Sequence, residues 1–183
     1  MRRLMVGAVL AGVVLVMPQA ASAQPQAGDR DVLIFANLTS ISGGGFNSTS
    51  GNLFFNIGQY LTERFEIGGG PAITISRTSF GVNGSSTSDT DIGIGANGFV
   101  RLYFGQNSPT NKPHVGAEIV FNRLNPEDGQ SIGDQTFLAG TGGLKNYLSE
   151  NAALDIKASY GFQANDPAAF KLFTVTVGLT YLF

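Results

Sequence analysis

The chain has 183 residues, of which 13% are charged, about half of the roughly 25% in an ordinary soluble domain. It contains 25 glycines and no cysteine, so disulfides cannot stabilise it as they do many exported domains. Its formal net charge of −2 argues against nucleic acid as a partner, because nucleic-acid-binding proteins carry basic surfaces.

Residues 1–23 have the pattern of a secretory signal peptide. Arg2 and Arg3 form a basic start, residues 4–17 form an uncharged apolar run, and Ala21-Ser22-Ala23 is an A-x-A cleavage site. A membrane-anchoring helix is the alternative, but the run is shorter than the roughly 20 residues that span a bilayer. We therefore predict a signal peptide (1–23), a flexible polar lead-in (24–30) and one domain (31–183).

Eight segments of this domain alternate between apolar residues and small or polar ones, as strands with two different faces do. They lie at 31–41, 52–61, 65–77, 91–104, 113–122, 135–148, 153–162 and 170–183. In the first segment Val32, Ile34, Ala36 and Leu38 share a face, but Leu33 and Phe35 interrupt the alternation and leave its facing open. Long polar loops are predicted at 42–51, 78–90, 123–134 and 163–169, and shorter links on the other side, with 105–112 as the exception.

The last segment alternates most clearly. One of its faces is apolar throughout: Phe173, Val175, Val177, Leu179, Tyr181 and Phe183. The other is mainly small or weakly polar: Leu172, Thr174, Thr176, Gly178, Thr180 and Leu182. The segment is long enough to cross a bilayer at a tilt, which takes about 9–11 residues.

Alternation alone does not tell which face is outside, because a soluble barrel has its apolar face inside and a membrane barrel has it outside. Three features favour the membrane: the low charge, the glycines that crowd the polar faces as a narrow lumen requires, and a signal peptide combined with a terminal Phe183. We predict an all-β, eight-stranded antiparallel transmembrane β-barrel. A soluble barrel that carries a ligand is the alternative.

The chain resembles the small bacterial outer-membrane β-barrel proteins, such as the transmembrane domain of OmpA-type proteins and OmpX. The resemblance rests on the Gly-x-Tyr-Leu-turn-Gly pattern over 58–68, on Arg101-Leu102-Tyr103-Phe104, and on the terminal Thr180-Tyr181-Leu182-Phe183. It implies a location in the outer membrane of a Gram-negative cell, with long loops outside and short turns in the periplasm. It also implies contact with outer-membrane lipid and lipopolysaccharide, and with the barrel-assembly machinery through the C-terminal strand.

If the polar faces point inward, the lumen contains seven ionisable side chains: Glu66, Arg101, His114, Glu118, Lys145, Asp155 and Lys157. Lys145 is expected directly across from Asp155, and Arg101 near Glu118 on the adjacent strand. Because buried charges must be paired, we predict a lumenal salt-bridge network. A polar path or gated pore is the alternative interpretation.

Aromatic residues gather where strands reach the short turns. Tyr60, Tyr103 and Tyr147 fall on the polar list and would close the end of the barrel from inside. Phe65, Phe104, Tyr181 and Phe183 fall on the apolar list and predict an aromatic belt at the periplasmic interface.

These features predict a structural or surface-interaction protein that supports outer-membrane integrity, without enzymatic activity or cofactor. A narrow porin-like passage for ions or small solutes is the first alternative, and a lipid-modifying enzyme the second. Against the enzyme, Gly116 stands where lipid A deacylases of this type have a Ser two residues after the His, here His114. One His and no Cys argue against a transition-metal site. Glu127, Asp128 and Asp134 could bind a divalent cation or lipopolysaccharide, although a solvated loop is the simpler interpretation.

Overall fold

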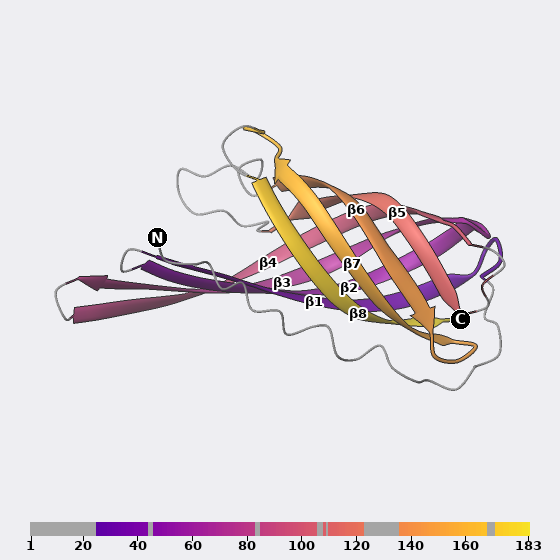
Figure 1. Cartoon of the computed structure of the whole chain (residues 1–183), viewed down its shortest axis with the longest axis horizontal. Coiled ribbons are helices and arrows are strands. Elements are labelled where there is room, and N and C mark those ends of the chain that lie inside the picture. Colours follow the sequence, from indigo (N-terminus) through magenta and orange to yellow (C-terminus); the bar gives the residue numbers. More distant parts are fainter. Residues whose placement is uncertain are drawn as a thin grey trace.

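The computed structural model describes residues 25–43, 46–82, 85–105, 108, 110–122, 136–167 and 171–183. They form one closed barrel in which each strand pairs antiparallel with the next and the last pairs with the first (Figure 1). The strands are β1 (Arg30–Gly43), β2 (Phe46–Thr62), β3 (Phe65–Val82), β4 (Ser85–Tyr103), β5 (Asn111–Phe121), β6 (Thr136–Tyr147), β7 (Ala152–Gln163) and β8 (Lys171–Leu182). The predicted eight-stranded antiparallel barrel is confirmed. The predicted signal peptide, Glu127, Asp128 and Asp134 lie outside the described residues.

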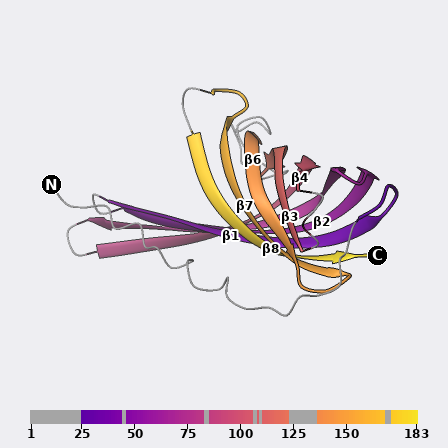
Figure 2. The same ribbon diagram turned by 45° about the vertical axis from the view of Figure 1, so that its right-hand side comes forward.

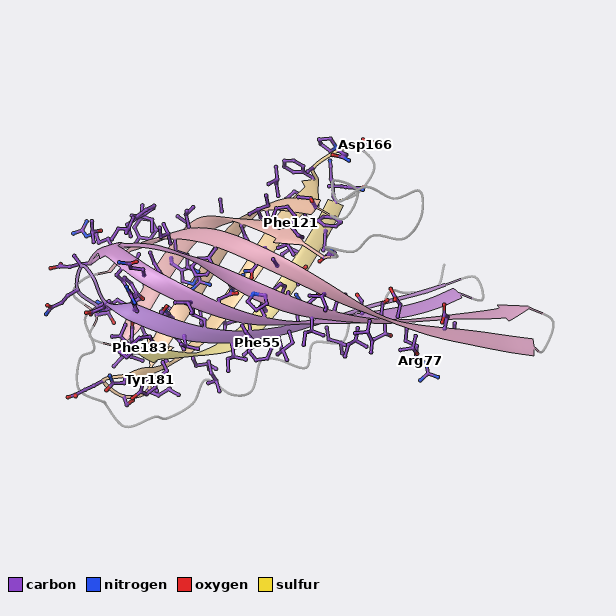
Figure 3. The ribbon with its side chains drawn as sticks, turned by 180° about the vertical axis from the view of Figure 1, so that it is seen from behind. Phe55, Arg77, Phe121, Asp166, Tyr181 and Phe183 are labelled. Carbon is purple, nitrogen blue, oxygen red and sulfur yellow. The ribbon has the colours of Figure 1, made fainter. Side chains whose placement is uncertain are left out.

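The apolar faces of the strands point away from the lumen. Large aliphatic side chains are exposed all around the wall, as for Ile57 at 60%, Ile94 at 61% and Leu179 at 61%. The first strand follows the same rule, since Ile34 is 44% exposed while its neighbours Leu33 and Phe35 are buried. Phe55 likewise points outward from the wall in the view from behind (Figure 3).

The first four strands continue beyond the closed part of the barrel. The ladder between β1 and β8 runs only from Asp31–Leu182 to Ala36–Val177, whereas the ladder between β1 and β2 continues to Gly43–Phe46. The pairing of β3 with β4 similarly extends to residues 82 and 85, although β4 pairs with β5 only over residues 96–103. The result is a four-stranded sheet that protrudes past the rim, on the left in Figure 1 and Figure 2.

This extension corrects two of the predicted loops. Most of 42–51 and 78–90 is strand, so these segments are the outer halves of two long hairpins. Their Ser, Thr, Asn and Gly residues are polar on both faces, so they lack the apolar alternation that indicates a half-buried strand. Pairing across each hairpin nevertheless satisfies the backbone hydrogen bonds, and threonine favours the extended conformation.

Tight connections close the opposite end of the barrel. Between β2 and β3 the hydroxyl of Thr62 accepts hydrogen bonds from the backbone N–H groups of Arg64 and Phe65. The N-terminal residues 25–29 form a turn in which Gly28, at φ +99°, donates its N–H to the carbonyl of Tyr60. In the described part of the chain no helix is long and apolar enough to span a membrane.

Candidate functional site in the barrel lumen

Three tyrosines close the lumen at the end with the tight turns. Tyr60, Tyr103 and Tyr147 are all buried, and they come from β2, β4 and β6, alternate strands around the wall. The hydroxyl oxygens of Tyr60 and Tyr147 lie 3.5 Å apart, and the ring centres of Tyr60 and Tyr103 lie 5.8 Å apart. The hydroxyl of Tyr103 donates a hydrogen bond to Glu66. This layer joins three sides of the barrel through the lumen.

A lysine lies at the centre of this layer. The Nζ of Lys145 donates hydrogen bonds to Asp31 at 2.8 Å and to the hydroxyl of Tyr60 at 2.9 Å, and it lies 3.8 Å from Glu66. Space for the two carboxylates comes from Gly58, where an added Cβ would lie 2.2 Å from Asp31 Oδ1 and 2.3 Å from Glu66 Oε1. The glycine therefore allows two acidic side chains to approach one ammonium group.

Arg101 forms a second ionic centre next to the first. Its guanidinium donates to Asp155 Oδ2 at 3.0 Å and lies 3.6 Å from Glu66 Oε2. The other oxygen of Asp155 lies 3.1 Å from Nε2 of His114. Because Glu66 contacts both Lys145 and Arg101, the two centres form one continuous network.

Aromatic rings and a further ion pair complete the filling. The guanidinium of Arg101 lies 4.3 Å from the ring centre of Phe99 and 5.1 Å from that of Phe35, distances at which a cation is attracted to a ring face. The ammonium of Lys157 also lies near Phe35, 5.2 Å from its ring centre, and it donates a hydrogen bond to Glu118. The turn side of the lumen is thus packed with large side chains and paired charges.

The energetics of this packing depend on pairing. Taking an ion out of water costs several kcal/mol, and only a partner with good geometry offsets that penalty. Arg101, Lys145, Glu66 and Asp155 are each at most 1% exposed, so each relies on the contacts described above. Losing one partner would leave a buried charge uncompensated, which typically costs about 3–5 kcal/mol.

The half of the lumen toward the protruding sheet is different, because it is hollow. A cavity of about 320 Å³ is lined by residues from all eight strands. Glu118 and Thr176 lie on its lining, and small residues such as Gly93, Gly161 and Ala139 leave its interior open. The lumen therefore combines a filled half with this open cavity, the cup.

All seven ionisable residues predicted from the sequence lie in this one lumen. Most of them, however, form ion pairs with other residues than the neighbours expected on the adjacent strand. Lys145 pairs in register with Asp155, yet its ammonium contacts Asp31 and Glu66 instead. Arg101 contacts Asp155 across the lumen, while Glu118, its expected neighbour, pairs with Lys157. Closure of the barrel places opposite walls within reach of long side chains, and adjacency along the sheet cannot reveal such contacts.

Asp31 is the member of the network that the sequence analysis did not include. It is fully buried and carries the shortest contact of Lys145. Alternation along the strand could have predicted its inward position, because Asp31 lies two residues before Leu33 and four before Phe35, on the same face. Since Leu33 and Phe35 are apolar, this face did not resemble the polar lumenal faces of the other strands.

The four outward aromatic residues lie at the end with the tight turns. Phe104, Tyr181 and Phe183 are exposed at 46%, 56% and 61%, and Phe65 is half-buried. Tyr181 and Phe183 extend from the wall at that end in Figure 3. Within the described ranges no three His, Cys, Asp or Glu side chains are grouped in a way that could hold a metal ion.

Neither a protein-family model nor a curated protein matches the chain. Among solved structures, the outer membrane protein OprG from Pseudomonas aeruginosa aligns with a TM-score of 0.53 and 14% identity, over 88% of this chain and 99% of OprG. The chain has the fold of the eight-stranded outer-membrane barrels. The N-terminal β-barrel domain of Pseudomonas aeruginosa OprF (TM-score 0.49, 15% identity, 87% of this chain and 100% of that one) is also similar. Yersinia pestis Ail in a phospholipid bilayer nanodisc is similar as well (TM-score 0.46, 20% identity, 85% of this chain and 99% of that one).

Proposed function

We propose that the protein is an integral outer-membrane barrel with a sealed lumen, and that it supports the membrane and presents the protruding β1–β4 sheet to the outside. Its role is structural and interactive, and it carries out no chemical reaction. The single observation that carries this proposal is the structural difference between the two halves of the barrel. One half is filled by paired ions and aromatic rings, while the other extends into two long polar hairpins.

The outer wall supports the location. Exposed aliphatic and aromatic side chains on every strand would form an apolar surface far larger than soluble monomers carry, whereas charged side chains occupy the inside. In a bilayer this arrangement is favourable, and the outward aromatic residues at the tight-turn end fit the headgroup region of the periplasmic leaflet. Lipopolysaccharide is a partner that suits the opposite end, where Arg77 and Lys171 are exposed cations (Figure 3 labels Arg77).

The protruding sheet can be tested separately from the barrel. Leu38 pairs with Gly51, and Ser76 pairs with Asp91, so each hairpin can be shortened at these pairs and closed with an Asn-Gly turn. We expect the shortened protein to reach the outer membrane and keep the gel mobility of a folded barrel. We also expect overexpression of the full chain to make cells aggregate with one another, and the shortened protein to lose this effect. Unchanged aggregation would contradict a surface role for the sheet.

A narrow passage for ions or small solutes is the second candidate, and the cup is the observation that favours it. An eight-stranded barrel is normally just filled by side chains, and the tyrosine and ion layers leave the cup blind at its base. Conduction would require these layers to rearrange. Single-channel recordings on the refolded protein test this: steps that vanish on changing Arg101 or Lys145 would favour the pore, and a silent bilayer favours the sealed barrel.

Lipid modification is the remaining alternative. His114 contacts Asp155, a pairing that could orient a general base, but Gly116 occupies the position of the expected nucleophile. We expect lipid A from cells that overexpress the protein to be unchanged by mass spectrometry. A lost acyl chain that depends on His114 would overturn the non-enzymatic assignment.

A further inference from the structure

We propose that the cup is a binding site for a neutral saccharide of one or two sugar rings. The inference goes beyond the proposed function, because binding in the cup requires neither a surface partner for the sheet nor a conducting lumen. It rests on the size, lining and built hydrogen-bond geometry of the cavity.

The cavity exists because the side chains change size abruptly along the lumen. Between Glu118 and the tight turns, the interior is filled by Arg101, Phe35 and Lys157, three of the large side chains in the barrel. On the side of Glu118 toward the protruding sheet, Gly161 and Ala139 stand at inward positions and leave about 320 Å³ open. Small-molecule sites range over roughly 300–1,000 Å³, so this volume suits a small polar ligand.

The lining is dominated by hydroxyl and amide groups. Serines, threonines and asparagines from five of the strands, together with Asn122 just after β5, line the cup, and Phe54 and Phe137 add aromatic side chains. Hydroxyl and amide groups both donate and accept hydrogen bonds, which is the pattern that sugar hydroxyls require. The aromatic rings provide apolar surface for the C–H faces of a sugar ring.

Part of this lining is already oriented. The amide nitrogen of Asn52 donates to Asn37 Oδ1 at 3.0 Å, and the hydroxyl of Thr74 donates to Asn52 Oδ1 at 2.6 Å. These bonds fix the amide groups and leave N–H donors of both asparagines for a ligand. Because these donors are already ordered, binding a ligand costs less conformational entropy.

The charge of the lining selects against ions. Among the residues that the structure describes, no lysine, arginine or histidine lines the cup, so a phosphate or carboxylate would meet no cation on this lining. An organic cation finds little to gain at Glu118, because Lys157 already pairs with that carboxylate, and the carboxylate of Asp91 likewise already has an interaction. An uncharged, hydroxyl-rich molecule is the class that the lining accommodates.

The experiment uses the full chain refolded in zwitterionic detergent micelles, because alkyl glucoside detergents would themselves present sugar headgroups. Saturation-transfer NMR is recorded with glucose, galactose, N-acetylglucosamine and maltose in turn, and with inorganic phosphate and ethanolamine as charged probes. We expect saturation transfer to the ring protons of at least one sugar, and its loss, or at least a tenfold weaker affinity, when Ser159→Leu fills the cup. The adjacent Ala158→Leu, which points outward, is the matched control and should bind as the parent does.

Folding of each variant is checked by its gel mobility with and without boiling, and Ala139→Leu is the second filling variant if Ser159→Leu does not refold. Three results would overturn the inference. The first is the absence of transfer to all four sugars, and the second is transfer that persists in a folded cup-filled variant. Ethanolamine or phosphate binding in place of the sugars would also overturn it, since the class of ligand would then be charged. The proposed surface role would survive any of these outcomes, because it does not depend on the cup.

Discussion

Replacing Asp155 with Asn should destabilise the barrel strongly, because this carboxylate is the closest partner of a fully buried arginine. Asp155 accepts from Arg101 at 3.0 Å and lies 3.1 Å from His114, and Asn would retain the volume but not the charge. Breaking a buried pair costs about 3–5 kcal/mol, and the remaining 3.6 Å contact of Arg101 with Glu66 places our expectation at the lower end, about 3 kcal/mol. No cavity is created, so the whole effect is electrostatic.

The assay is equilibrium urea unfolding of the protein in phospholipid vesicles, followed by the fraction that migrates as folded on an unboiled gel. With a denaturant slope of about 1–3 kcal/mol per molar, the urea midpoint should fall by roughly 1–3 M. Glu150→Gln, on the exposed turn between β6 and β7, is the charge-matched control and should remain within about 0.5 kcal/mol of the parent.

A double variant separates the lost pair from the unpaired charge. Arg101→Met combined with Asp155→Leu removes both ions, so it should be clearly more stable than Asp155→Asn alone, as replacing buried pairs with apolar residues often is. A loss below about 1 kcal/mol for Asp155→Asn would refute the reasoning, since Asp155 would then not be compensating a buried charge.

Three further changes test facing, register and assembly. Val177→Lys on the outer face should cost about 2–4 kcal/mol near the bilayer midplane, whereas Thr174→Lys, which points into the cup, should cost less than about 1 kcal/mol in the same urea titration. Cysteines at Ile34 and Leu179, which are paired across the β1–β8 ladder, should form a disulfide detectable by mass spectrometry. Phe183→Ala should leave refolding in vitro unchanged because the side chain is 61% exposed, but should reduce the amount assembled in the outer membrane of cells if the assembly machinery recognises the C-terminal strand.

Each of these has a result that contradicts it. Equal costs for the two lysine substitutions would invalidate the assignment of inner and outer faces. For the register, Leu38 and Val175 are the matched outward pair beyond the last rung at Ala36–Val177, and cysteines there should cross-link poorly. Equally efficient cross-linking would mean that β1 and β8 remain paired to the rim. Normal assembly of the Phe183 variant would exclude that residue as the signal.

The strands with one apolar face could be predicted from the sequence, because burial on one side and lipid on the other impose a period of two. The protruding halves of β1–β4 could not, since Ser48, Thr49 and Ser50 resemble a loop when no face is apolar. What determines their conformation is pairing with the adjacent strand, for example Thr49 with Arg77, and such pairing has no local signature.

The lumenal network shows a similar limit. Inward facing of Arg101 and Lys145 follows from alternation along their strands. Their partners follow from closure instead, because Asp155 and Asp31 reach them across the lumen from β7 and β1. The open cup results from the small residues on the side of Glu118 toward the protruding sheet. No pattern in the sequence indicates where along the lumen the large side chains end.

The most direct test of the account is the gel mobility of the protein in fractionated cells, with and without boiling. We expect the protein to sediment with the outer membrane and to shift in mobility on boiling, as a closed barrel that resists detergent does. A protein found in the soluble periplasm without a shift would contradict it, because the exposed apolar faces would then have to be a buried core.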